Sequence, residues 1–142
     1  MPPAYVHLLA AKDLIDRRYA EPLDTAALAR AAHASEYHFI RSFRQVFGET
    51  PHQYLQRRRI ERAQELLRGT GETVTRVCLA VGFQSLGSFS DAFRRLVGEP
   101  PSAYRARQQE QVPAAVPACF AMMGTRPTDR AIPEKPAGRG AA

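Results

Sequence analysis

Apolar residues recur every three or four positions along several stretches between residues 4 and 109, which is the spacing of amphipathic α-helices. Two stretches show this spacing most clearly, because aromatic residues line one side of each. The core-facing sets are Phe39, Phe43, Val46 and Phe47 in the first stretch and Phe89, Phe93, Leu96 and Val97 in the second. The pattern predicts an all-α fold of about seven helices.

The two aromatic stretches belong to an internal repeat with an offset of 50 residues. The coinciding pairs are Ser35 and Ser85, Phe39 and Phe89, Phe43 and Phe93, Arg44 and Arg94, Gly48 and Gly98, Pro51 and Pro101, and Tyr54 and Tyr104. Upstream, Thr25 falls on Thr75, and residues 26–32 fall on residues 76–82. A duplicated core would explain the Phe and Gly pairs but not the polar ones, so we expect a duplicated functional unit.

Each repeat predicts a helix, a tight turn and a second helix, which is the helix-turn-helix pattern. In the first unit Asp24 is an N-cap, and Ser35 caps a second helix that ends at Gly48. In the second unit Gly82 makes the turn and Ser85 caps the second helix. Two such patterns in register predict two helix-turn-helix subdomains.

A long amphipathic helix over residues 50–68 joins the two units. Thr50 is its predicted N-cap, Pro51 takes the first helical position, and Gln53 can complete a capping box. About 18 helical residues extend about 27 Å at 1.5 Å per residue. Two recognition helices on one face of B-DNA need a separation of about 34 Å. With the widths of the helices at its ends added, the connector has about the right length.

The composition changes after residue 110, where prolines and glycines accumulate and the helical period disappears. We therefore expect one double helix-turn-helix domain and a mostly disordered tail. The predicted boundaries are 1–110 for the domain, 4–48 for its first unit, 50–68 for the linker helix, 73–109 for the second unit and 111–142 for the tail. An uncharged apolar cluster at 112–123 either lies against the last helix or docks a partner.

The formal charge of +6 and the pI of about 9.9 favour a polyanionic partner. Only two of the 20 basic residues are Lys, which fits phosphate and guanine recognition and equally a genome rich in Arg codons. The N-terminus predicts neither a signal peptide nor a membrane span. Cys78 and Cys119 lie far apart and show no metal-ligand spacing. We expect a cytoplasmic protein without a metal or cofactor.

The polar face of the first aromatic helix carries the residues suited to DNA. With the Phe residues in the core, a step of 100° per residue puts Tyr37, Arg41, Arg44 and Gln45 on the opposite side. Arg41 can bond guanine O6 and N7, and Tyr37 can pack on a thymine methyl group. Ile40 flanks this face, and a thymine methyl would explain it. The phosphate contacts expected here are those of Ser35, Arg44 and Gln45. The alternative is a solvated helix face.

The same rotation in the second aromatic helix exposes a different set, in which Gly87 replaces Tyr37 and Asp91 replaces Arg41. Asp91 can accept from cytosine N4 or pair with Arg95 one turn on. Leu86 and Ser88 at the helix start can approach bases. We therefore expect unequal halves, in which the first unit supplies most base readout and the second mainly binds phosphates. The second unit's phosphate contacts are expected from Ser85, Arg94, Arg95 and Arg105.

The linker helix carries four basic residues within six positions, namely Arg57, Arg58, Arg59 and Arg62. They cannot all face one way on a helix. We expect at least one of them to pair with Glu61 or Glu65, and another with Asp13 or Asp16.

Several longer motifs in the chain are specific. They are Ser35-x3-Phe39-x-Arg41-x-Phe43-x4-Gly48, Pro51-x2-Tyr54, Arg59-Ile60-x2-Ala63-x2-Leu66-Leu67 and Val81-Gly82-Phe83, followed by Ser88-Phe89-x3-Phe93-x4-Gly98-x-Pro100-x2-Ala103-Tyr104-Arg105. Over residues 4–109 they resemble the DNA-binding domain of the AraC/XylS family of bacterial transcription regulators. The resemblance implies a seven-helix domain that often binds an asymmetric site as a monomer and acts mostly by recruiting RNA polymerase.

The resemblance also implies which positions contact bases. These are Tyr37, Ile40 and Arg41 in the first unit and Leu86, Gly87, Ser88 and Asp91 in the second. Asp91 departs from the commonly basic residue at its position. Many members carry an effector-binding domain, for which this chain has no room, so we expect either a minimal form or a truncated product of a longer regulator.

The predicted function is sequence-specific binding of duplex DNA by a transcription regulator that activates transcription. We do not expect an enzyme. The four His residues show no ligand spacing, and no phosphate loop or nucleophile motif appears. The alternatives are a repressor, a module that sequesters another protein, and a DNA-repair adaptor with a reactive Cys78 or Cys119. A sequestering module would show little salt-dependent DNA binding.

Overall fold

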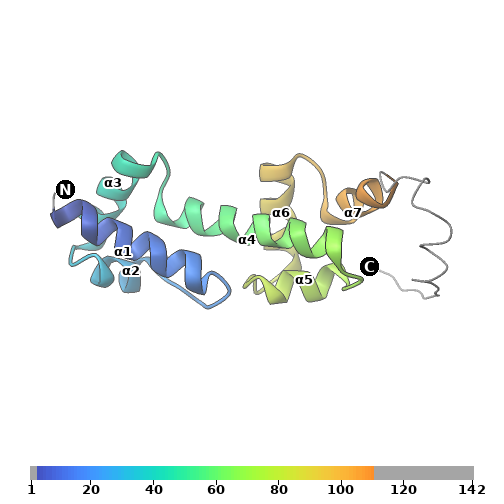
Figure 1. The fold of residues 1–142 in the computed structure, drawn as a ribbon, viewed down its shortest axis with the longest axis horizontal. Helices are drawn as coiled ribbons and strands as arrows, with labels where there is room; N and C mark the ends of the chain where they lie inside the picture. The colour runs from blue at the N-terminus through green and yellow to red at the C-terminus, as the bar shows by residue number, and fades with distance from the viewer. Residues whose placement is uncertain (1–2, 111–142) are drawn as a thin grey trace, which may run out of the picture. The chain divides into compact units, whose positions relative to one another are not determined.

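The computed structural model describes residues 3–110, which form seven α-helices and no strand (Figure 1). The helices are α1 (Pro3–Arg18), α2 (Thr25–Ala31), α3 (Glu36–Phe47), α4 (Pro51–Gly69), α5 (Val74–Ala80), α6 (Leu86–Val97) and α7 (Pro101–Glu110). The all-α prediction is confirmed. The predicted disorder of residues 111–142, and the docking role considered for 112–123, lie outside the described residues. Within residues 3–110 no helix is long and apolar enough to cross a bilayer.

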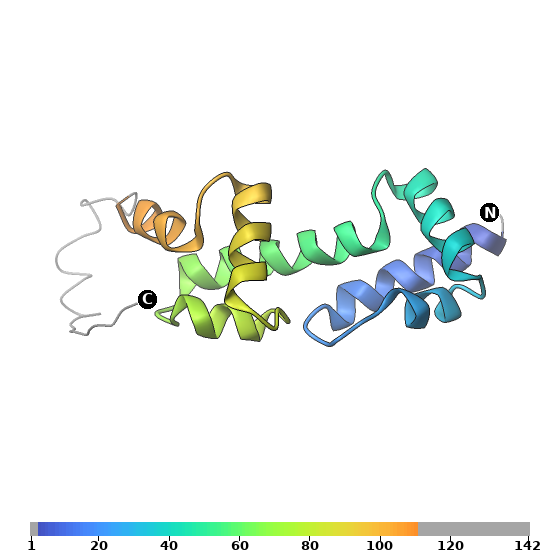
Figure 2. The same ribbon diagram turned by 180° about the vertical axis from the view of Figure 1, so that it is seen from behind.

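The first compact unit comprises residues up to Arg62 together with Ala80–Phe83. Helices α1, α2 and α3 pack on one another around a buried core (Figure 2). Phe43 lies at the centre of this core, with ring centroids 4.6 Å from Phe47 and 6.0 Å from Tyr54. The prediction that the aromatic stripe faces the interior is confirmed here.

The second unit comprises Ala63–Leu79 and the chain from Gln84 onward, described to residue 110. Phe89 and Phe93 are fully buried, and the ring of Phe93 meets that of Tyr104 edge-on at 5.4 Å. This contact repeats the pairing of Phe43 with Tyr54 in the first unit. The internal repeat therefore reproduces an aromatic core contact as well as a sequence motif.

The predicted ends of the two aromatic helices are also found. The hydroxyl of Ser35 accepts a hydrogen bond from the His38 amide at 3.3 Å, and that of Ser85 accepts one from the Ser88 amide at 3.1 Å. Gly48 and Gly98 end the helices at φ of 84° and 100°, which are left-handed conformations that favour glycine.

Linker helix α4 begins with the reciprocal capping pair that the sequence predicts. The Gln53 amide donates to Thr50 Oγ1 at 3.2 Å, and the Thr50 amide donates to Gln53 Oε1 at 2.9 Å. Pro51 follows the cap, where its missing N–H leaves no hydrogen bond unmade.

The repeat shifts by one residue between its two halves. Asp24 caps α2 through the Ala27 amide at 2.7 Å, and Thr73 caps α5 through the Arg76 amide at 3.1 Å. These matching caps relate α2 and α5 by 49 residues, whereas α3 and α6 are related by 50. The predicted alignment of Thr25 with Thr75 is therefore off by one. The extra residue lies in the second turn, where Phe83 is buried.

One part of the predicted core faces outward instead. Val46 and the equivalent Leu96 are each 43% exposed, although the sequence places both in the apolar stripe. Each lies about 60° to one side of the central Phe of its helix, in the last turn, where no other element of residues 3–110 covers it. The stripe is therefore narrower than the sequence suggests.

Candidate nucleic-acid interface

The face of α3 opposite its buried Phe residues is exposed and polar. Tyr37 is 70% exposed, Arg41, Arg44 and Gln45 are exposed, and Ile40 is half-buried. The structure thus places the candidate DNA-contacting residues of the first unit together on one accessible helix face. A helix of this width and exposure can enter a major groove.

Two of these side chains contact each other. Arg41 Nη1 donates a hydrogen bond to the Tyr37 hydroxyl at 3.1 Å, and the Arg41 guanidinium carbon lies 5.6 Å from the centroid of the Tyr37 ring. The helix pattern by itself suggests two independent base contacts, whereas the structure joins the two side chains. The signal that indicates the pair is their spacing of four, which makes them neighbours on a helix surface.

Arg44 and Arg94 occupy equivalent exposed positions near the ends of α3 and α6. Within residues 3–110, neither side chain forms a hydrogen bond or an ion pair. A guanidinium that no carboxylate neutralises retains its full charge for an external anion.

The exposed face of α6 differs from that of α3. Leu86 is 45% exposed, and Gly87, Ser88 and Asp91 are exposed as well. The Ser85 hydroxyl donates to the Ser88 hydroxyl at 2.9 Å, so the start of α6 is internally bonded. Among the proposed base-contacting positions of this helix, none carries a long hydrogen-bond donor. The pairing of Asp91 with Arg95 stays a prediction.

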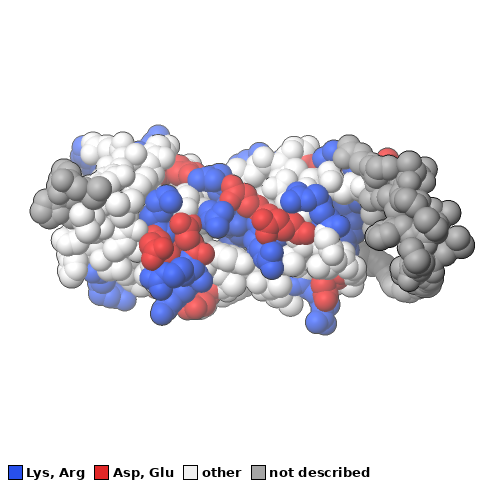
Figure 3. Space-filling view, viewed as in Figure 1, with Lys and Arg blue, Asp and Glu red and all other residues white. Residues whose placement is uncertain are grey.

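Two arginines of α4, Arg57 and Arg58, are held by carboxylates of the first unit, as the sequence predicts. Arg57 bonds Glu49 at 2.7 Å and Glu61 at 2.8 Å, and these hydrogen bonds raise the pKa of its guanidinium, Glu49 having the largest effect. Arg58 lies 2.7 Å from Glu61 and 3.1 Å from Asp16. Figure 3 shows acidic and basic side chains interleaved over α1 and α4. This charge is largely neutralised within the protein.

Arg59 and Arg105 bond backbone carbonyls instead of carboxylates. Arg59 donates to the Tyr19 carbonyl at 2.6 Å and the Glu21 carbonyl at 2.9 Å, and Arg105 donates to the carbonyls of Leu67 at 3.3 Å and Thr70 at 3.2 Å. Burial lowers the pKa of both guanidinium groups. The phosphate contact predicted for Arg105 stays a prediction, and these bonds give the residue a structural role at the end of α4.

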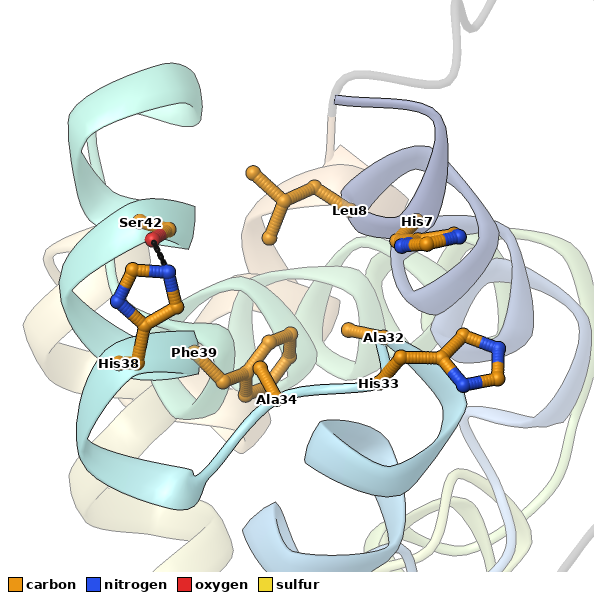
Figure 4. Close-up of a pocket in the computed structure, with 8 residues that line it drawn as sticks. All are labelled: His7, Leu8, Ala32, His33, Ala34, His38, Phe39 and Ser42. Atoms are coloured by element: carbon orange, nitrogen blue, oxygen red, sulfur yellow. Dashed lines mark hydrogen bonds between the residues drawn. The ribbon is translucent and has the colours of Figure 1, made fainter. Parts of the chain in front are cut away.

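A small pocket lies beside α3, where α1 and the first turn meet it (Figure 4). His7 and His33 lie there with ring centroids 4.7 Å apart, and His38 Nε2 is 3.4 Å from the Ser42 hydroxyl. The volume of about 100 Å³ is well below the roughly 300–1,000 Å³ of small-molecule sites. Within residues 3–110, no group of three His, Cys, Asp or Glu side chains is placed to hold a metal ion.

The chain is similar to DNA-binding regulators over its described part. Residues 28–107 match the helix-turn-helix domain family. The MmsAB operon regulatory protein of Pseudomonas aeruginosa is 35% identical over 88 residues, which are 62% of this chain and 29% of that protein. The bifunctional transcriptional activator and DNA repair enzyme AdaA of Bacillus subtilis is 29% identical over 93 residues, which are 66% of this chain and 44% of AdaA. The chain thus spans less than half the length of these curated relatives.

A solved structure extends the likeness to three dimensions. The crystal structure of the DNA-binding domain of AdpA, a global transcriptional factor, in complex with a target DNA matches with a TM-score of 0.67 and 31% identity. The match covers 81% of this chain and 100% of that domain. The likeness therefore includes both helix-turn-helix units.

Proposed function

Because the chain belongs to the AraC-type family of helix-turn-helix DNA-binding domains, we propose that it is a transcription regulator that binds duplex DNA sequence-specifically. Helices α3 and α6 are the proposed recognition helices, each entering a major groove. The proposed base contacts are Tyr37, Ile40, Arg41, Leu86, Gly87, Ser88 and Asp91. The proposed phosphate contacts are Ser35, Arg44, Gln45, Ser85, Arg94, Arg95 and Arg105.

The observation that carries the proposal is the difference between two groups of arginines. On α4, Arg57 and Arg58 are neutralised by carboxylates. On α3 and α6, the exposed Arg44 and Arg94 have no such partner within residues 3–110. A phosphate backbone supplies the charge that these two positions lack, and the release of its counterions drives binding.

The two units are proposed to contribute unequally. Arg41 on α3 can read guanine, whereas the equivalent position on α6 is Asp91, which can only accept hydrogen bonds when ionised. The first unit therefore supplies most base readout and the second mainly positions the protein on the backbone. Binding as a monomer, and activation through RNA polymerase, are further parts of the proposal, supported by the family resemblance.

Selection of bound fragments from random duplex DNA, followed by affinity measurements at several salt concentrations, tests the proposal. Arg41→Ala is expected to cost about 1–3 kcal/mol and to relax one base pair. Arg94→Ala is expected to weaken binding to all DNA sequences alike. It is also expected to reduce by about one the slope of the logarithm of the binding constant against the logarithm of the salt concentration. Arg17→Ala, which removes an exposed arginine from α1, is the matched control and is expected to change neither property.

Two outcomes would count against the proposal. Absence of an enriched sequence, or binding that does not weaken as salt rises, contradicts sequence-specific DNA binding and favours a protein-sequestering module. Equal changes of sequence preference in Arg41→Ala and Arg94→Ala contradict only the unequal halves.

A further inference from the structure

The side chain of Arg41 is held in place before any DNA is bound. Its Nη1 donates to the Tyr37 hydroxyl at 3.1 Å, and its guanidinium carbon lies 5.6 Å from the centroid of the Tyr37 ring. A hydrogen bond fixes one end of the guanidinium, and the cation lies within cation–π range of the ring. Both contacts come from residues one turn apart, so α3 alone is sufficient to form them.

The exposure of Tyr37 indicates that its ring does not serve the core. At 70% it is the most exposed of the large hydrophobic and aromatic side chains in the described part of the chain. The aromatic residues on the opposite side of α3, Phe39 and Phe43, are fully buried. Within residues 3–110, the polar and cation–π contacts of the Tyr37 side chain are those with Arg41.

The contact between Tyr37 and Arg41, called the clamp below, leaves Arg41 able to read a base. A guanidinium has five N–H donors, and only one of them bonds Tyr37. Within residues 3–110 the edge formed by Nε and Nη2 of Arg41 makes no hydrogen bond. Two parallel N–H groups are what guanine O6 and N7 require. A held guanidinium also loses less rotamer freedom when DNA binds.

We propose that Tyr37 is a positioning residue for base readout, and that it acts by holding the Arg41 guanidinium instead of contacting a thymine itself. This inference rests on the proposed function, because it concerns how the first unit achieves its specificity. It replaces the base contact proposed above for Tyr37, in which the ring packs on a thymine methyl group. If Tyr37 holds Arg41, a Tyr37 substitution changes the preference at the base pair that Arg41 reads. If Tyr37 contacts a thymine itself, the substitution changes the preference at a different base pair.

The second unit offers an internal comparison for this pair. Counting from the equivalent N-caps Ser35 and Ser85, the positions of Tyr37 and Arg41 hold Gly87 and Asp91. The clamp is therefore specific to the first unit, although the helices that would carry it have the same length and caps. This agrees with the proposal that the first unit dominates base readout.

The first arm of the test uses the free protein and needs no DNA. Nuclear relaxation of the guanidinium Nε reports the order of Arg41, with Arg44 on the same helix as the unclamped control. We expect Arg41 to be more ordered than Arg44 in the wild type and to become as mobile as Arg44 in Tyr37→Leu. Tyr37→Phe, which retains the ring and loses the hydroxyl, is expected to lie between them. Equal mobility of Arg41 and Arg44 in the wild type overturns the inference.

The second arm measures base preference after selection for Tyr37→Leu, Tyr37→Phe, Arg41→Ala and the double variant Tyr37→Leu/Arg41→Ala. Tyr37→Leu is expected to weaken guanine preference roughly threefold to tenfold at the base pair that Arg41→Ala relaxes. At that base pair the double variant is expected to match Arg41→Ala. A merely structural role of Tyr37 would lower affinity for all sequences without changing the preference there.

The outcomes separate this inference from the function on which it rests. Loss of preference at a different base pair, adding to that of Arg41→Ala, overturns it in favour of a direct Tyr37 contact. A wild-type preference that Tyr37→Leu leaves intact also overturns it, while the proposed function stands. A wild type without any sequence preference contradicts the proposed function as well.

Discussion

His33 and Gly82 occupy the same position in the two helix-turn-helix units, and both have a left-handed backbone, with φ of 57° and 105°. The equivalence follows from the offset of 49 between α2 and α5. His33 is the only residue other than glycine with a positive φ in the described part of the chain, and its ring lies 4.7 Å from that of His7. The left-handed turn is thus a property of the fold, and each unit satisfies it with a different residue.

Gly82 is expected to tolerate no side chain, in contrast to His33. A Cβ at residue 82 would lie 3.0 Å from the Ala20 backbone and 3.0 Å from Arg59 Nε, besides the strain of a positive φ. Gly82→Ala is therefore expected to destabilise the protein by about 2–3 kcal/mol, measured by urea unfolding. Gly87→Ala is the control, because a Cβ there meets nothing within 4 Å, and it is expected to stabilise by up to about 1 kcal/mol. Similar free energies of unfolding for both variants would contradict this account.

Arg59 is expected to contribute to stability through the α1–α2 loop. Its guanidinium donates to the Tyr19 and Glu21 carbonyls, and its Cζ lies over the Phe83 ring, 5.6 Å from the ring centroid. Arg59→Ala leaves two acceptors without their donor, and we expect a loss of about 2–3 kcal/mol in the free energy of unfolding. Arg17→Ala, which breaks an exposed ion pair with Asp13, is the control and is expected to cost at most about 0.5 kcal/mol. A loss no larger than that of the control would show that these bonds contribute little.

The Tyr37–Arg41 pair is expected to be transferable to α6. Gly87 has open space around a Cβ, and both Gly87 and Asp91 are exposed, so the two positions can carry the substitutions Gly87→Tyr and Asp91→Arg on the outer face of α6. We expect the double variant to gain guanine preference at one base pair of the second half-site, measured by selection from random DNA. Asp91→Arg alone is the control and is expected to gain less, because its guanidinium is not held. Equal gains in the two variants would indicate that a tyrosine adds nothing to readout.

Cys78 is expected to be unreactive, which bears on the DNA-repair alternative. It is 1% exposed, its thiol lies 3.5 Å from the Ser85 carbonyl, and burial raises its pKa. In a Cys119→Ser variant, alkylation by iodoacetamide at pH 8 is expected to be at least about tenfold slower in the folded protein than in urea, because the thiolate is the reactive form. Equal rates would show that the Cys78 thiol is accessible in the folded protein, and would favour the DNA-repair alternative.

The raised pKa of Cys78 also predicts that the free energy of unfolding depends on pH. Burial raises the pKa of Cys78, so the folded protein holds the thiol proton to higher pH than the unfolded chain does. The unfolded thiol releases its proton near pH 8.5. The unfolded state therefore binds fewer protons above that pH, and the Cys78 contribution to stability falls as pH rises through it. Cys78→Ala is expected to remove this dependence in unfolding curves recorded between about pH 7 and 10. A variant that retains the wild-type slope would assign the dependence to other groups.

Local chemistry in the sequence determined most of the helices and their ends. The caps at Asp24, Ser35, Thr50 and Ser85 each join atoms at most three residues apart, so they can be predicted from neighbouring residues alone. The aromatic stripe predicted which side of α3 is buried, and its opposite side contains the proposed DNA contacts. Composition and the repeat then indicated nucleic acid as the partner.

Tertiary structure alone decided what the long polar side chains do. Arg59 reaches carbonyls 38 and 40 residues away, and Arg105 reaches Leu67, 38 residues away. A flexible guanidinium can bond phosphate, carboxylate or carbonyl oxygen, and which of these lies within reach depends on how the chain folds back. The exposure of Val46 was decided in the same way, because no other element of residues 3–110 covers that side of the last turn of α3.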